Sequence, residues 1–138
     1  ATTIMPPFLE IVHAEVPTIL VADDSLTARQ TLALTLKKAG YRVLQARDGR
    51  EALDHLRQEK SNIQAVFCDV EMPQMNGFEF LNHCRQEFPR EVLPVIMLTS
   101  RSSEKHQRIA QLLGATAYLT KPYLEHEMLK TLKSCLSV

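Results

Sequence analysis

Charged and hydroxyl side chains follow four apolar segments of the chain, at the point where each segment ends. These groups are Asp23–Asp24, Asp69, Thr99–Ser100 and Lys121–Pro122. Carboxylates packed within a few ångströms repel one another unless a cation offsets their charge, and such oxygen ligands suit Mg²⁺, with Mn²⁺ as the alternative cation. A cation beside a lysine and a threonine hydroxyl can bind the oxygens of a phosphoryl group, while a carboxylate serves as nucleophile. These residue types predict metal-assisted phosphoryl transfer if the fold brings them together.

Each of these residues, taken alone, has a simpler interpretation. An acidic residue after a strand is usually a helix cap or a solvated loop charge, and a single Lys-Pro pair is usually part of a loop. The coincidence becomes informative only if the four segments are strands of one sheet. The pattern of the whole chain therefore decides between the two interpretations.

Short apolar segments and amphipathic segments alternate from Thr18 to the end of the sequence. Runs rich in apolar and β-branched residues predict strands, expected at 18–22, 42–46, 63–68, 92–98 and 115–120. Apolar residues at helical spacing predict a helix after every strand, beginning near Ser25, Asp48, Asn76, Ser102 or Ser103, and Leu124. In the last two helices we expect inward positions at Ile109, Leu112 and Leu113, and at Leu124, Met128, Leu132 and Leu136. Gly40 and Gly114 are expected to end the helices before them.

Five successive strand–helix units predict an α/β fold with a parallel sheet and helices on both faces. Right-handed crossovers favour a flavodoxin-like, doubly wound sheet with strand order 2-1-3-4-5 and five helices. In such a sheet a site lies at the carboxyl ends of the strands, where the strand order reverses, which places the four chemical groups at one edge. We assign residues 18–138 to this domain and residues 1–17, which contain Pro6–Pro7 and Pro17, to an N-terminal arm or linker.

The composition argues against several function classes. Lys and Arg number 16, as do Asp and Glu, so a formal net charge of zero offers no basic face to nucleic acid. No apolar run approaches the roughly 18 residues of a membrane helix, and no signal peptide is recognisable, so we expect a cytoplasmic protein that binds neither nucleic acid nor membrane. Cys68, Cys84 and Cys135 are widely spaced, which favours reduced, buried thiols over a metal cluster. The turn at 22–25 also lacks the glycines of a nucleotide-binding loop.

The combination of motifs resembles the receiver domain of two-component signalling from about Thr18 to the C-terminus. The matching residues are Asp23–Asp24, Asp69-x-x-Met72-Pro73-x-Met75-x-Gly77, Thr99–Ser100 and Lys121–Pro122. The resemblance implies that Asp69 accepts a phosphoryl group from a phosphohistidine in a Mg²⁺-dependent reaction. It also implies slow autodephosphorylation and a conformational switch of the face formed by the fourth helix, fifth strand and fifth helix.

The resemblance further assigns the acidic residues. It implies that Asp24, Asp69 and the backbone carbonyl of Glu71 bind the metal, with Asp23 acting mainly through a metal-bound water. Glu71 and Arg101 lie two residues beyond Asp69 and Thr99, on adjacent loops at the expected mouth of the site. We expect this pair to tune the lifetime of the phosphoryl group, with an ordinary solvated ion pair as the alternative.

The remaining assignments concern the phosphoryl group and the switch. The resemblance implies that Lys121 and Thr99 contact the phosphoryl group and that Thr99 is coupled to Tyr118, which stands at the switch position. It also implies a cis peptide between Lys121 and Pro122. Asn76 stands where the family often has Asp, a minor departure because both residues cap helices.

Two further stretches, 24–30 and 45–53, resemble receivers attached to chemotaxis-type hybrid histidine kinases. A stand-alone regulator of the chemotaxis type is the alternative. The implied partners are a histidine kinase or a histidine phosphotransfer domain, together with a downstream signalling protein or kinase domains in the same chain. The sequence contains no kinase ATP-binding motif and no DNA-binding output domain, so the chemistry expected of it is its own phosphorylation and dephosphorylation.

Two other function classes compete with this interpretation. The first is a degenerate receiver, a phosphorylation-independent protein-binding module, which is disfavoured because every acidic and basic residue of the site is present. The second is a haloacid-dehalogenase-type phosphatase, which also forms an aspartyl phosphate. That class requires D-x-D-x-[TV], and Asp69-Val70-Glu71-Met72-Pro73 departs from it at the second acid.

Overall fold

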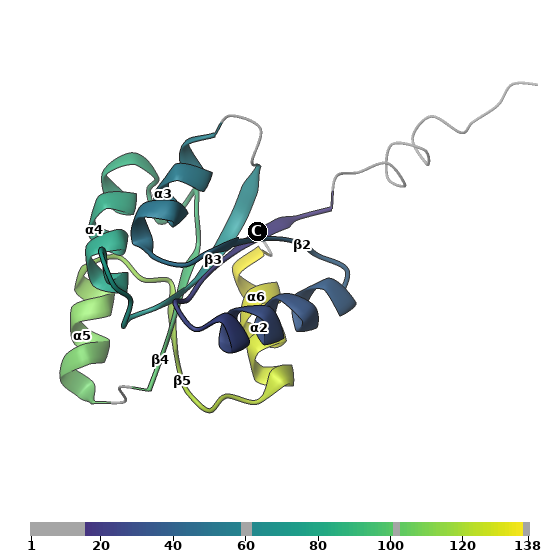
Figure 1. The fold of residues 1–138 in the computed structure, drawn as a ribbon. Helices are drawn as coiled ribbons and strands as arrows, with labels where there is room; N and C mark the ends of the chain where they lie inside the picture. The colour runs from purple at the N-terminus through teal and green to yellow at the C-terminus, as the bar shows by residue number, and fades with distance from the viewer. Residues whose placement is uncertain (1–15, 59–61, 101–102, 137–138) are drawn as a thin grey trace, which may run out of the picture.

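The computed structural model describes residues 16–58, 62–100 and 103–136, along which strands and helices alternate (Figure 1). The strands are β1 (Thr18–Ala22), β2 (Arg42–Ala46), β3 (Ile63–Asp69), β4 (Val95–Thr99) and β5 (Ala117–Thr120). The helices are α2 (Leu26–Lys38), α3 (Gly49–Arg57), α4 (Gly77–Glu87), α5 (Glu104–Leu112) and α6 (Glu125–Leu136). The predicted succession of five strands and five helices is confirmed over these residues.

The strands form one sheet in the order β2-β1-β3-β4-β5, and every neighbouring pair is parallel. Helices α3, α4 and α5 lie on one face of this sheet, and α2 and α6 lie on the other (Figure 1). The predicted flavodoxin-like order 2-1-3-4-5 is therefore confirmed. The strand order reverses between β1 and β3, so the carboxyl ends of these two strands flank the crevice where α/β sheets place their sites.

Each face of the sheet has its own apolar core, because successive strand residues point to opposite sides. Val66 of β3 packs with Phe80 and Leu81 of α4 in one core. The next residue, Phe67, packs with Leu36 of α2 in the other core. A sheet covered on both faces explains why β1 and β4 are buried at every position.

Polar residues begin the helices where the sequence predicts them. Ser25, Asp48, Asn76 and Ser103 are N-caps, and the side chain of each accepts a hydrogen bond from a backbone N–H of the first turn. Two glycines end helices: Gly40 and Gly114 both have φ +99°, a conformation that side chains with a Cβ rarely adopt. These local signals set the lengths of the crossovers and hence the positions of the loops at the site.

Two predicted strands begin too early. β4 begins at Val95 rather than Val92, because Val92 is 67% exposed in the turn that follows α4. β5 begins at Ala117 rather than Ala115, because Ala115 belongs to the hydrogen-bonded end of α5, where its N–H donates to the Ala110 carbonyl. Both errors lie at the amino ends of the strands, away from the site.

Two predicted core positions are also wrong. Leu112 is 80% exposed, because the side of α5 that faces the protein follows His106, Ile109, Ala110 and Leu113. Leu124 is 57% exposed and precedes the first residue of α6. Residues 1–15 of the expected arm lie outside the described residues. In the described part of the chain, none of the helices has the length and apolarity that crossing a bilayer requires.

Candidate functional site

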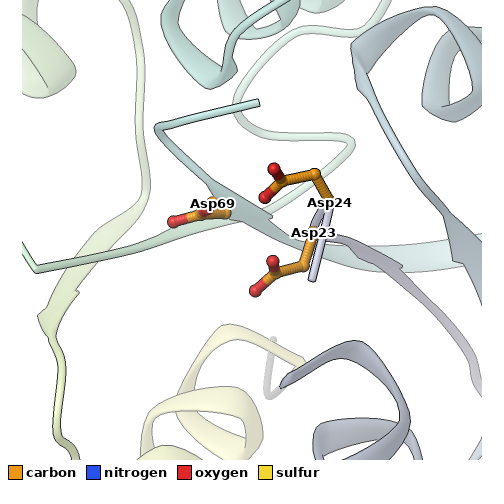
Figure 2. A group of neighbouring side chains, drawn as sticks. All are labelled: Asp23, Asp24 and Asp69. Atoms are coloured by element: carbon orange, nitrogen blue, oxygen red, sulfur yellow. The ribbon is translucent and has the colours of Figure 1, made fainter. Parts of the chain in front are cut away.

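The turn between β1 and α2 carries two neighbouring acidic residues. Asp23 is only 5% exposed, whereas Asp24 is exposed to solvent. The N–H of Ser25 donates to Asp23 Oδ1 at 2.9 Å, and the N–H of Asp23 donates to the carbonyl of Ala46 on β2 at 3.0 Å. Hydrogen bonds from its neighbours thus hold Asp23 in place. The side chains of Asp23 and Asp24 lie at the same edge of the sheet as Asp69 (Figure 2).

Asp69 is the last residue of β3 and is almost fully buried. Asp23, Asp24 and Asp69 each offer a carboxylate oxygen, and these atoms lie within 4.8 Å of one another (Figure 2). Burial raises the pKa of Asp69 to about 6; the charge of Lys121 opposes this shift, and the charges of Asp23 and Asp24 add to it. The cluster therefore carries an electrostatic strain that a bound cation would relieve.

Lys121 follows β5 and reaches the same cluster. Its Nζ lies 3.0 Å from Asp23 Oδ2 and 3.6 Å from Asp69 Oδ1. Burial lowers the pKa of Lys121, but the hydrogen bond to Asp23 and the negative charges of Asp69 and Asp23 outweigh that effect and leave the pKa raised. The ammonium group is consequently charged and sits between two carboxylates.

The ends of β4 and β5 are joined beside this lysine. Thr99, the last residue of β4, is completely buried, and its carbonyl accepts a hydrogen bond from the Lys121 N–H at 2.8 Å. The Lys121–Pro122 peptide is cis, as expected. The carboxyl ends of β1, β3, β4 and β5 thus gather the predicted carboxylates, hydroxyl and ammonium at one edge, whereas the chemical roles of these residues stay predictions.

Gly77 allows α4 to approach the end of β3. Its N–H donates to the carbonyl of Val70 at 2.8 Å. A Cβ at this position would lie 2.2 Å from the backbone oxygen of Asp69 and 2.8 Å from the Val70 Cα. Any side chain would therefore displace the backbone that carries Asp69, which gives a physical reason for glycine at this position in the motif.

The remaining predicted residues lie around the acidic cluster or outside the residues that the structure describes. Glu71 is exposed and, with Asp24, lines an open hollow beside the cluster. Tyr118 is half-buried on β5, where it packs against the core that contains Ala110 of α5. Arg101 lies outside the described residues.

Sequence reasoning assigned no role to Arg29, which the structure places next to the site. This residue lies on α2, is only 8% exposed, and donates from Nη1 to the carbonyl of Asp23 at 2.9 Å. Its Nε also donates to Gln45 Oε1 on β2 at 3.1 Å. The available signal was an arginine at a position that helical spacing places among apolar residues. A single charged residue in such a pattern does not by itself indicate a role.

The cluster fits a divalent cation. Oxygens of three carboxylates from two strand ends lie within 4.8 Å of one another, close enough to reach one cation directly or through its waters, and hard cations such as Mg²⁺ prefer oxygen ligands and retain several waters. Asp24 is exposed, so the site opens to solvent on one side. Asp23, Asp24 and Asp69 are the residues that would hold the ion.

Comparison with known proteins gives a consistent result. Residues 19–133 match the response regulator receiver domain family. Protein PilH of Pseudomonas aeruginosa is 35% identical over 119 residues, which are 86% of this chain and 97% of PilH. Chemotaxis protein CheV2 of Helicobacter pylori is 40% identical over 116 residues, which are 81% of this chain but only 37% of CheV2.

Solved structures show the same relationship. The chemotaxis protein CheY4 of Vibrio cholerae superimposes with a TM-score of 0.81 at 37% identity, covering 88% of this chain and all of CheY4. The family match spans every strand from the second residue of β1 onward and includes Asp23, Asp24, Asp69, Thr99 and Lys121. The chain therefore belongs to the response regulator receiver domain family of two-component signalling.

Proposed function

We propose that Asp69 is the phosphoacceptor of this receiver and takes a phosphoryl group from a phosphohistidine. The observation that carries the proposal is the Lys121 ammonium, 3.6 Å from Asp69 Oδ1, beside a cluster of three carboxylates. A buried carboxylate next to a fixed cation offers both a nucleophile and a counter-charge for the oxygens of the incoming group.

The transfer is a substitution at phosphorus. A carboxylate oxygen of Asp69 forms the new P–O bond while the P–N bond of the donor breaks, and its electron pair returns to the imidazole. The ring leaves in its neutral form when its other nitrogen carries a proton. Hydrolysis later returns Asp69 and releases inorganic phosphate when water attacks phosphorus.

The residues around Asp69 have separate tasks in this scheme. Asp24, Asp69 and the carbonyl of Glu71 would hold Mg²⁺, with Mn²⁺ as a substitute, and Asp23 would hold a metal-bound water. When bound, the cation neutralises charge on the phosphoryl oxygens. Lys121 would balance a second oxygen, since its Nζ already lies between Asp23 and Asp69.

Thr99 and Tyr118 form the proposed switch. The Thr99 hydroxyl would bind the third phosphoryl oxygen, and its movement would leave space for Tyr118 to turn inward. Tyr118 is half-buried against the core beneath α5, so a change in its packing would reach the α5–β5–α6 face.

The partners follow from this chemistry. A histidine kinase or histidine phosphotransfer domain would donate the phosphoryl group in the cytoplasm, and a downstream signalling protein or linked kinase domains would read the switch. CheV2, of which this chain spans 37%, shows that a related domain occurs within a longer chemotaxis protein. We therefore include both a stand-alone regulator and a domain of a hybrid kinase in this proposal.

Intact-mass measurement tests the proposal directly. The full chain is incubated with Mg²⁺ and acetyl phosphate, and the mass and the released acetate are followed together. Gain of a single phosphoryl group, stable in acid and labile in base, supports a receiver. Rapid turnover of many equivalents with no phosphorylated protein accumulating would support a phosphatase, and an unchanged mass with no acetate released would support a degenerate binding module.

The metal is tested without phosphorylation. Mg²⁺ should raise the melting temperature, because an ion bound only by the folded state stabilises it by mass action. Asp24→Ala should remove most of this increase, whereas Asp54→Ala, which changes an exposed carboxylate on α3, should keep it. Equal melting temperatures in Mg²⁺ and in EDTA would contradict the metal site.

A further inference from the structure

Arg29 is a buried cation on the helix that follows the acidic turn. It is 8% exposed and occupies the same buried side of α2 as Leu32 and Leu36. Burying a guanidinium removes it from water, a cost that must be offset by hydrogen bonds or charge. Two such bonds are present: Nη1 donates to the Asp23 carbonyl at 2.9 Å, and Nε donates to Gln45 Oε1 at 3.1 Å.

The carbonyl that Arg29 binds belongs to the peptide joining the two acidic residues. Fixing this oxygen fixes the plane of the peptide and hence the position of the Asp24 Cα. Among the described residues, no hydrogen bond is made to the Asp24 carboxylate, so that side chain depends on its backbone for its position. Asp23, by contrast, is also held by the Ser25 N–H and by Lys121.

We propose that Arg29, anchored by Gln45, is a positioning residue that presents the Asp23–Asp24 turn to the divalent cation. This inference rests on the proposed function, since it concerns the affinity of the same metal site. Arg29 touches neither the reacting atoms nor the carboxylate oxygens in any hydrogen bond that the structure describes. It acts through the backbone of Asp23.

Gln45 provides a second hydrogen bond that holds the Arg29 guanidinium in place. It lies on the edge strand β2, paired with Val21 of β1, and its own carbonyl is hydrogen-bonded to Nε2 of His55 at 3.0 Å. The amide therefore comes from a fixed strand and restrains the guanidinium at Nε, while Nη1 binds the Asp23 carbonyl. An arginine can use both bonds at once because its nitrogens form a planar fork, which lysine lacks.

Charge and positioning predict opposite results when Arg29 is neutralised. Removing a buried cation beside the backbone of the Asp23–Asp24 turn would by itself strengthen Mg²⁺ binding, because repulsion between the cation and the ion disappears. Releasing the Asp23 carbonyl would weaken Mg²⁺ binding, because the turn would no longer be held for coordination. The sign of the change therefore separates the two effects.

The experiment measures the dissociation constant of Mg²⁺ by calorimetry on the full chain. Arg29→Ala and Arg29→Lys should weaken binding by roughly 10-fold, the lower end of the range for residues that orient metal ligands. Gln45→Ala should weaken binding in the same direction but less, since Arg29 keeps its bond to Asp23. Arg47→Ala is the matched control, because that arginine is exposed and forms a surface ion pair with Glu51.

Phosphorylation kinetics add a readout that a general loss of stability would not reproduce. In Arg29→Lys the Mg²⁺ concentration for half-maximal rate should rise by roughly 10-fold, while the rate at saturating Mg²⁺ stays within about two-fold of the parent. Circular dichroism of the metal-free variants verifies folding. If Arg29→Ala fails to fold, Arg29→Lys and Gln45→Ala carry the test.

Mg²⁺ affinity that is unchanged or tighter in the Arg29 variants would overturn the inference, as would a loss no larger than that of Arg47→Ala. A parent protein that binds no Mg²⁺ would instead refute the proposed function. The two failures are therefore distinguishable in one set of titrations.

Discussion

Helices α2 and α5 lie on opposite faces of the sheet but are packed very differently. α2 buries Leu32, Ala33 and Leu36 together with Arg29, and it adjoins β1, a strand buried at every position. α5 buries only Ala110 and leaves Leu112 80% exposed, and it adjoins β5, which is half-buried along its whole length. The two helices therefore flank the site with unequal amounts of apolar burial.

This difference in burial divides the site into a well-packed part beside α2 and a sparsely packed part beside α5. Elements with many buried apolar contacts open rarely, whereas sparsely packed elements exchange between conformations more easily. Asp23 and Asp24 belong to the well-packed part. Tyr118 and the segments around α5 belong to the sparsely packed part. A site built in this way can keep its acidic cluster in place while the surface of α5 and β5 responds.

The largest effect is expected from Asp69→Asn, which acts on the chemistry and leaves both parts folded. The amide keeps the shape of the side chain but is a poor nucleophile and removes a metal-binding charge, so phosphorylation should fall by about 1,000-fold or more. Intact mass after incubation with acetyl phosphate measures the change. An acid-stable, base-labile adduct formed at the parent rate would show that Asp69 is not the acceptor.

Truncation of one leucine in each helix tests the packing difference itself. Leu36→Ala on α2 removes a fully buried side chain and should lower the free energy of unfolding by about 2–5 kcal/mol. Leu112→Ala on α5 should change it by no more than about 0.5 kcal/mol. Urea unfolding of both variants provides the comparison, and equal losses would mean that the two helices are equally supported.

The pH dependence of the metal-free protein tests the strain in the acidic cluster. Because the folded state raises the pKa of Asp69 to about 6, protonation of Asp69 favours folding. This contribution is complete below the unfolded pKa of about 4 and is lost as the pH rises through about 6. It amounts to at most about 3 kcal/mol.

Asp69→Asn lacks this titration and serves as the reference. In EDTA the variant should be more stable than the parent at pH 7.5, and the difference should shrink as the pH falls through 6 towards 4. Urea midpoints across this range measure the difference. A constant difference would mean that the pKa of Asp69 is not raised in the folded protein.

Hydrogen exchange after phosphorylation tests which part of the site responds. Amides in α5, β5 and the start of α6 should change their exchange rates, because the proposed switch passes through Tyr118. Amides in α2 should keep theirs, because that helix is held by its buried face. Changes confined to α2, or the absence of any change in residues 104–128, would contradict the proposed switch.

The smallest effect concerns the predicted pair of Glu71 and Arg101. A double-mutant cycle uses Glu71→Ala, Arg101→Ala and the double variant, with the rate of dephosphorylation as the readout. A coupling energy of about 0.5 kcal/mol or more would support a gate over the path of the attacking water. Strictly additive effects would leave the two residues as ordinary surface charges.

Local signals were sufficient for the order of the elements and for most of the site. Buried strands, N-caps at Ser25, Asp48 and Asn76, and glycines after helices are short-range features, so the sequence alone predicts them. The right-handedness of the crossovers then leaves few possible topologies. The sequence therefore predicts both the strand order and the convergence of Asp23, Asp69 and Lys121.

Contacts between distant segments decided the rest. The spacing of Ile109, Leu112 and Leu113 allows more than one buried side for α5, and only the neighbours of the helix select the one that excludes Leu112. The raised pKa of Asp69 depends on how closely three strand ends approach, which spacing along the chain does not encode.

Arg29 shows the same limit at the site. By sequence it is one basic residue in an amphipathic helix, a type that is usually exposed. Its burial, and its bonds to Asp23 and Gln45, exist only because α2 packs where β1 and β2 end. The sequence by itself therefore determined the chemistry available at the sheet edge, whereas the tertiary structure decided which residues hold that chemistry in position, because such support comes from segments that meet only in the folded chain.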